Sequence, residues 1–216
     1  MGDADLKRAS TRAAACAFAL AGQVCISLQR IFVEECVFDE FTSLLVKKTG
    51  QMRTGNQLLE TTDVGPMIDE KAAENTQILV DEAVGLGAKL LTGGKRSGSL
   101  YLPSVLVSVP DDTRFFKEEA FAPLVLVNPV KSLVEAIRET NKSVYGLQAG
   151  IFTKDISAAM QAAHEIDAGG VMINEAPTFR ADLQPYGGMK QSGIGREGPK
   201  FAIEEMTELK AVAFHL

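Results

Sequence analysis

Cysteine and histidine are both scarce in this chain of 216 residues, which holds three cysteines and two histidines. Cys16, Cys25 and Cys36 are odd in number and all lie in the first sixth of the chain, so the sequence indicates no disulfide framework. The cysteines also lack the Cys-x-x-Cys spacing of a zinc site, and only His164 and His215 remain to complete one. We therefore expect reduced thiols, no metal and a cytoplasmic location.

Long basic runs and long apolar runs are absent as well. The net charge is −6 and both signs are mixed along the chain, which gives no surface for nucleic acid or for an anionic membrane. The apolar stretch 13–20 is too short and too rich in alanine to cross a bilayer. The polar start of the chain, residues 1–5, does not have the pattern of a signal peptide. We expect neither nucleic acid nor a membrane as a partner.

Helical and strand patterns alternate along the sequence. Apolar spacing and glycine breaks predict a first helix that is capped by Asp3 or Asp5 and runs through 13–20, and further helices over 34–49, 68–86, 132–141, 155–166 and 199–206. Runs of β-branched and aromatic residues predict strands over 29–33, 89–91, 101–109, 124–130, 147–152, 170–173 and 209–214. In the helix over 68–86, the apolar spacing predicts that Ile78, Leu79 and Val84 face the core. The alternation favours an α/β fold with a mostly parallel sheet and helices on both faces.

Cys25 is the cysteine best placed for chemistry. Cys16 lies among alanines within the first helix, where burial is usual for a free cysteine, and Cys36 opens the next helix, so both favour structural roles. Cys25 instead follows Gly22 and Gln23 at a break between helix and strand, where free backbone amides stabilise a thiolate and an oxyanion. Gly22 leaves the approach to the sulfur open. The residues alone support a catalytic and a structural Cys25 about equally.

Three segments resemble signatures of the aldehyde dehydrogenase superfamily. The first is Phe18-x-x-x-Gly22-Gln23-x-Cys25, with Arg30 five residues further on. The second is residues 117–124, Lys-Glu-Glu-Ala-Phe-Ala-Pro-Leu, in which Ala122 stands where the family usually has glycine. The third is the glycine-rich loop over 186–197. Their order and spacing agree with the family over essentially the whole chain.

The resemblance implies the catalytic part of an NAD(P)-dependent aldehyde dehydrogenase. Cys25 would attack the aldehyde to give a thiohemiacetal, hydride would pass to NAD or NADP, and water would release a carboxylic acid from the resulting thioester. Glu119 would hold the nicotinamide ribose, and Phe121 would pack beside the nicotinamide. Without the resemblance, Glu118 and Glu119 are typical of a solvated acidic pair.

The resemblance also implies that the cofactor-binding domain is absent. Family members are roughly twice this length, and their first half is a Rossmann-type domain whose phosphate-binding glycine turn we do not find here. The family's general-base Glu and its second oxyanion donor, an Asn, belong to that half. We therefore expect a catalytic domain over 1–206, a terminal strand over 207–216 that helps to build homo-oligomers, and no aldehyde oxidation by this chain alone.

Arg180 is the clearest candidate for binding the substrate. Within the resemblance, Arg180 lies where the lactaldehyde, phosphonoacetaldehyde and non-phosphorylating glyceraldehyde-3-phosphate dehydrogenases place an arginine, and the adjacent Phe179 is a second substrate-binding candidate. A guanidinium group matches phosphate or carboxylate, although an arginine in a loop is as often simply solvated. Val24 stands where phosphate-binding members often carry arginine. The predicted substrate is a small or anionic aldehyde.

Two other functions stay open at this point. A stand-alone thiol esterase or acyl transferase would use Cys25 together with a histidine or carboxylate base. His164 and His215 both lie far from Cys25 in the sequence. A non-catalytic fragment or interaction module would use no thiol chemistry. A nitrophenyl-ester assay that compares a Cys25→Ser variant with the parent chain therefore separates the two classes.

Overall fold

Four strands form the central sheet of the computed structural model, which describes all residues from 1 to 216. Their order is β1 (Arg30–Glu34), β6 (Leu124–Val130), β5 (Ser104–Val107) and β2 (Lys89–Thr92). β1, β6 and β5 are parallel to one another, and β2 is antiparallel to β5. A separate parallel pair consists of β8 (Gln148–Ile151) and β9 (Gly170–Ile173). The mostly parallel sheet expected from the sequence is confirmed.

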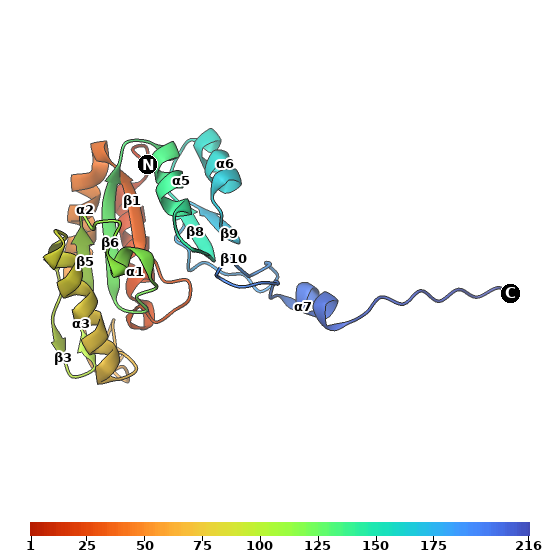
Figure 1. Ribbon diagram of the computed structural model, residues 1–216, viewed down its shortest axis with the longest axis horizontal. Coiled ribbons are helices and arrows are strands. Elements are labelled where there is room, and N and C mark those ends of the chain that lie inside the picture. Colours follow the sequence, from red (N-terminus) through yellow and green to blue (C-terminus); the bar gives the residue numbers. More distant parts are fainter.

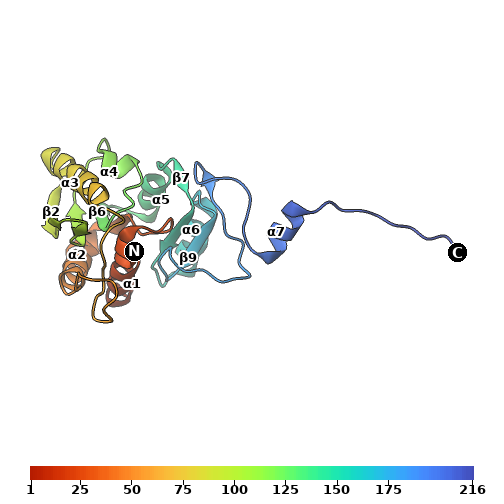
Figure 2. The ribbon, with the colours of Figure 1, turned by 90° about the horizontal axis from the view of Figure 1, so that it is seen from below.

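Helices cover both faces of the central sheet. α1 (Leu6–Phe18) and α2 (Glu35–Gly50) pack together on one face. α3 (Glu70–Gly85), α4 (Arg114–Lys117) and α5 (Leu133–Asn141) lie on the other face, as Figure 2 shows. α6 (Ile156–Glu165) packs against β9 and α5. Because both faces are covered, residues 124–127 of β6 are fully buried, which explains why this strand begins as an unbroken apolar run.

Shorter elements complete the chain: η1 (Ala19–Gly22), β3 (Arg96–Ser97), β4 (Leu100–Tyr101), β7 (Tyr145–Gly146), β10 (Met189–Lys190) and α7 (Pro199–Met206). β3 pairs with β4, and β10 pairs with β7. Residues 52–67 hold one isolated bridge and otherwise form a loop, as Gly55, Gly65 and Pro66 predict. None of the helices has the length and hydropathy needed to span a membrane.

Polar side chains fix where the helices begin. Asp5 accepts a hydrogen bond from the amide of Arg8 at 3.0 Å, which confirms an aspartate cap for the first helix. Asp69 and Ser132 cap α3 and α5 in the same way. Each cap satisfies an amide that has no partner inside its helix. α1 consequently starts at Leu6, earlier than its apolar residues suggest, and α3 starts just after Asp69.

The structure corrects the sequence prediction at three places. Ile78 and Val84 are 54% and 44% exposed because α3 turns only one side, with Leu79, toward the sheet. The strand predicted over 101–109 is divided into β4 and β5 around Pro103, which has no amide hydrogen for a ladder. Residues 207–216 form no strand, since they leave the body after α7 and meet no partner strand (Figure 1).

Candidate active site

Cys25 follows a left-handed turn at the end of α1. Residues 20–22 have φ values of 50°, 56° and 71°, a region that residues other than glycine rarely adopt. The side chain of Gln23 braces this turn: it donates to the carbonyl of Leu20 at 3.1 Å and accepts from the amide of Ile68 at 2.9 Å. The glutamine of the first signature therefore has a structural explanation, because it fixes the loop that presents Cys25.

Gly22 brings two of the signature segments into contact. A Cβ atom on Gly22 would lie 2.0 Å from the backbone oxygen of Ala122, so a larger residue does not fit. This corrects the explanation drawn from the sequence: the space beside Gly22 is taken by the Ala122 carbonyl and is not a path to the sulfur. The close approach joins the loop of Cys25 to residues 117–124.

Tyr186 is the one hydrogen-bond partner of the Cys25 thiol, with its hydroxyl 3.0 Å from Sγ. Cys25 is exposed, whereas Tyr186 is only 7% exposed. Burial, and then the hydrogen bond with Cys25, raise the pKa of Tyr186 above its ordinary value. The hydroxyl therefore keeps its proton at neutral pH and can donate it to a thiolate. Tyr186 opens the third signature, but sequence reasoning assigned it no role.

Arg180 stacks on the same tyrosine. Its Cζ atom lies 4.3 Å from the centroid of the Tyr186 ring, a cation–π contact. Its Nη2 atom donates to Glu197 at 3.0 Å, and the backbones of residues 186 and 197 are bonded to each other. The Arg180 side chain remains 47% exposed. The fold thus connects Arg180 to Cys25 through one tyrosine, a connection that no local sequence pattern predicts.

Helix α1 holds the loop that carries Arg180. The guanidinium of Arg12 forms an ion pair with Glu175, and the hydroxyl of Thr178 lies 2.6 Å from Sγ of Cys16. Cys16 is buried, as its place among alanines predicts. Cys36 is exposed on the first turn of α2, so it is not a core residue.

Cys25 and Glu119 line the same cavity, which has a volume of about 450 Å³. Glu118 pairs with Arg114 on the surface at 3.1 Å, whereas Glu119 makes no ion pair. Although Glu119 is exposed, desolvation by the surrounding protein raises the pKa of its carboxyl group. A carboxylate without a partner can accept hydrogen bonds from hydroxyl groups, including those of a ribose.

The two aromatic candidates lie outside this cavity. Phe121 and Phe179 are 44% and 47% exposed, and neither lines it. His164 lies in the last turn of α6 and His215 lies in the exposed tail, and neither bonds to Cys25. The geometry therefore offers no histidine base for a thiol esterase.

Comparisons with known proteins agree with the sequence resemblance. Residues 1–212 match the model of the aldehyde dehydrogenase family. The 3-sulfolactaldehyde dehydrogenase of Priestia aryabhattai is 47% identical over 214 residues, which are 99% of this chain and 45% of that protein. A lactaldehyde dehydrogenase of Methanococcus maripaludis is 44% identical, over 99% of this chain and 46% of its own length.

A solved structure shows the same fold. The glyceraldehyde-3-phosphate dehydrogenase of Methanocaldococcus jannaschii, complexed with NADP, superposes with a TM-score of 0.93 at 42% identity, covering 96% of this chain and 45% of that one. The chain thus spans somewhat less than half the length of the relatives it matches.

Proposed function

Because this chain belongs to the aldehyde dehydrogenase family, we propose that it forms the catalytic part of an NAD(P)-dependent enzyme that oxidises an aldehyde to a carboxylic acid. The observation that carries the proposal is the setting of Cys25, an exposed thiol hydrogen-bonded to Tyr186 at a cavity that Glu119 also lines. An oriented thiol with a proton donor beside it is suited to attack on a carbonyl carbon.

The chemistry begins with the Cys25 thiolate, which forms a carbon–sulfur bond to the aldehyde while the carbonyl oxygen becomes an oxyanion. The backbone amide of Cys25 has no partner in the chain and is available to that oxyanion. Tyr186 donates to the sulfur and orients it. A nicotinamide cofactor, held at its ribose by Glu119, would supply the acceptor for the hydride that leaves the same carbon. Water then splits the thioester on Cys25, which releases the acid and restores the thiol.

The residues of this chain fit the nicotinamide end of NAD or NADP. Glu119, which has no ion-pair partner, would accept hydrogen bonds from the ribose hydroxyls. Phe121 follows closely in the chain and offers an exposed ring for packing beside the nicotinamide. No glycine turn that joins a strand to a helix is present to hold the phosphates.

The substrate we propose is a small aldehyde with an anionic group. Arg180 would bind that group, with Phe179 beside it, because the Arg180 guanidinium is half-exposed and stands next to the partner of Cys25. Two of the relatives carry names of anionic aldehydes, 3-sulfolactaldehyde and glyceraldehyde-3-phosphate. An arginine fork matches such groups better than a lysine does.

Protection of Cys25 from alkylation tests this proposal without a cofactor. The chain, in a Cys36→Ser background, is treated with iodoacetamide, and the labelled cysteine is located by mass spectrometry. Succinic semialdehyde should slow the labelling of Cys25, because a thiohemiacetal occupies the sulfur. Succinate, which has the charge but no aldehyde group, should not slow it. Labelling that falls on Cys16 instead, or equal protection by succinate, contradicts the proposal.

Arg180→Gln tests the substrate class in the same assay. The concentration of succinic semialdehyde that halves the labelling rate should rise roughly ten-fold, since a charge-assisted hydrogen bond is lost. The concentration of propanal, an uncharged aldehyde, that halves the labelling rate should be the same for Arg180→Gln and for the parent chain. An equal change for both aldehydes would leave Arg180 without a role in recognising the anion.

A further inference from the structure

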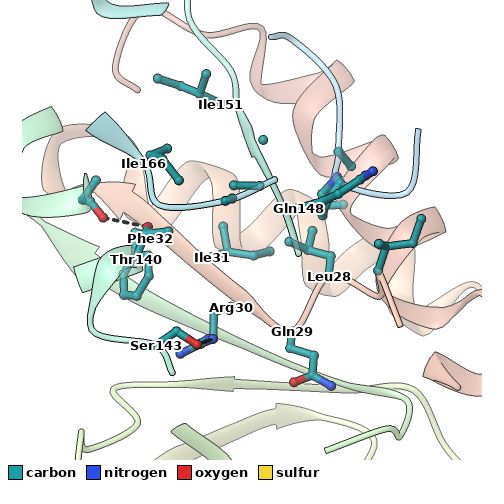
Figure 3. Close-up of a pocket in the computed structure, with 18 of the residues that line it drawn as sticks. Leu28, Gln29, Arg30, Ile31, Phe32, Thr140, Ser143, Gln148, Ile151 and Ile166 are labelled. Atoms are coloured by element: carbon teal, nitrogen blue, oxygen red, sulfur yellow. Dashed lines mark hydrogen bonds between the residues drawn. The ribbon is translucent and has the colours of Figure 1, made fainter. Parts of the chain in front are cut away.

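An apolar groove separates β1 from β8. The cavity that reaches Cys25 extends along it, and 23 of its 37 lining residues are hydrophobic. Figure 3 shows Leu28–Phe32 along one side, with Gln148 and Ile151 across from them. β1 pairs only with β6, and β8 pairs only with β9, so each strand has a second edge without a partner strand. Unpaired edges of this kind accept another strand.

The two facing edges run in the same direction. The ammonium group of Met1 donates to the carbonyl of Phe152, just after β8, at 3.0 Å. The amide of Gly2 donates to the carboxylate of Glu34, the last residue of β1. The start of the chain therefore lies between the carboxyl ends of both strands, and the edges of β1 and β8 are parallel.

Helices close the groove on both sides. α1 contributes Leu6, Ala9 and Ala13, which share one helix face, and α5 contributes Leu133, Ala136 and Ile137 from the opposite side of the sheet. A strand lying between β1 and β8 would be covered on both faces. Strands covered in this way are apolar along their whole length. Oε1 of Gln148 is buried without a hydrogen-bond partner and is available to a donor on such a strand.

We propose that this groove binds an extended apolar peptide segment as an additional strand, parallel to β1 and β8 and hydrogen-bonded to both. The central sheet would then continue without interruption from β2 to β9. β1 has five residues, so a segment of similar length fills the groove. Relatives of more than twice this chain's length contain further polypeptide from which such a segment can come. The proposal does not depend on the thiol chemistry of Cys25.

Peptide binding to the whole chain tests the proposal. The probe is a fluorescent peptide of about seven residues, with a core of alternating valine and isoleucine and a lysine at each end. Its matched control has proline at the centre, which cannot donate to a strand ladder. The first peptide should bind with saturation in fluorescence anisotropy and slow amide hydrogen exchange roughly ten-fold in Arg30–Glu34 and Gln148–Ile151. The proline peptide should do neither.

Two variants locate the binding site. Ala136→Phe fills the groove from α5 and should raise the Kd at least roughly ten-fold. Ala163→Phe, on the exposed side of α6, should leave the Kd unchanged. Equal binding of the proline peptide, or protection confined to the free edge of β2, overturns the proposal. Protection of β1 and β8 that grows with chain concentration in the absence of peptide would show that a second copy fills the groove, and would overturn our choice of occupant.

Discussion

At the scale of single residues, Tyr186 touches both groups to which we assign chemistry. Its hydroxyl lies 3.0 Å from the Cys25 sulfur, and its ring carries the Arg180 guanidinium at 4.3 Å. The two contacts use different parts of the side chain. Phenylalanine at this position keeps the ring and removes the hydroxyl, so one substitution separates the two contributions.

We predict that Tyr186→Phe slows alkylation of Cys25 at neutral pH about ten-fold, because a hydrogen bond to a charged group contributes about 1.5–3 kcal/mol. Labelling of Cys36, which is exposed and distant in the sequence, is the internal control and should not change. Anion recognition should persist, since the ring still supports Arg180. An unchanged rate at Cys25 would show that the tyrosine does not act on the thiol.

Two features restrict position 22 to glycine: its positive φ and the close carbonyl group of Ala122. Gly22→Ala should lower the free energy of unfolding by more than the roughly 1–2 kcal/mol that a left-handed φ costs, because the new Cβ meets the Ala122 carbonyl. Gly98→Ala is the matched control: φ is +58° and nothing lies within 4 Å of the added Cβ. Urea denaturation of both variants isolates the contribution of the close approach. Equal losses would show that the backbone at Ala122 moves aside.

At the scale of elements, the start of the chain is fastened to the loop after β8. The Asp3 carboxylate accepts hydrogen bonds from the Thr153 hydroxyl and from the amides of Lys154 and Asp155. Desolvation raises the pKa of Asp3, but these hydrogen bonds outweigh it and hold the pKa below its usual 3.8. Since the folded value lies below the unfolded one, the stabilisation is present above pH 3.8 and is lost as the pH falls through the folded value.

We therefore predict that Asp3→Asn destabilises the chain at neutral pH and that the difference from the parent shrinks once the pH falls below the folded pKa of Asp3. Thermal unfolding at a series of pH values measures both. Asp182→Asn, in an exposed loop, serves as the control and should change stability neither at neutral pH nor at the lowest pH. A difference that persists at the lowest pH would mean that the carboxylate charge is not what fastens the segment.

Elements with an unambiguous local pattern are those that the sequence predicts well. The bounds of β6, β9 and α7 agree with the prediction residue for residue. β6 opens with an unbroken apolar run, and α7 begins at a proline, whose fixed φ suits the first turn of a helix. Cys25 stands out as well, because its break between helix and strand is local. Local signals of this kind need no knowledge of distant residues.

Features made by distant residues or by unusual backbone could not be predicted. The contact between Cys25 and Tyr186 joins residues 161 positions apart. Leu20 and Ala21 adopt left-handed φ values that neither residue type favours, so nothing in their identity signals the turn. The apolar spacing of α3 predicts burial of Ile78 and Val84, but periodicity cannot say whether another part of this chain covers them.

At the scale of the whole molecule, the tail over 207–216 is the part least explained by the chain's own packing. Leu209, Phe214 and Leu216 are fully or largely exposed, and α7 before them buries no residue. We predict that deleting residues 207–216 leaves the free energy of unfolding unchanged and reduces self-association, as an extended apolar segment can pair with an edge strand of a second copy. Sedimentation velocity and urea denaturation of the full and shortened chains measure the two effects. A large loss of stability would show that the tail packs on its own chain.

We expect aldehyde oxidation to require more polypeptide than this chain provides. The chain supplies Cys25, Tyr186 and Glu119, and it matches 45% of the 3-sulfolactaldehyde dehydrogenase of Priestia aryabhattai. We predict that the purified chain produces no NAD(P)H from aldehyde above the level of its Cys25→Ser variant, although Cys25 is alkylated readily. Co-expression with the part of that relative which this chain does not match should restore Cys25-dependent NAD(P)H formation, because cofactor and thiol then meet across the same cavity. NAD(P)H formation by the chain alone would show that its own residues hold the whole cofactor.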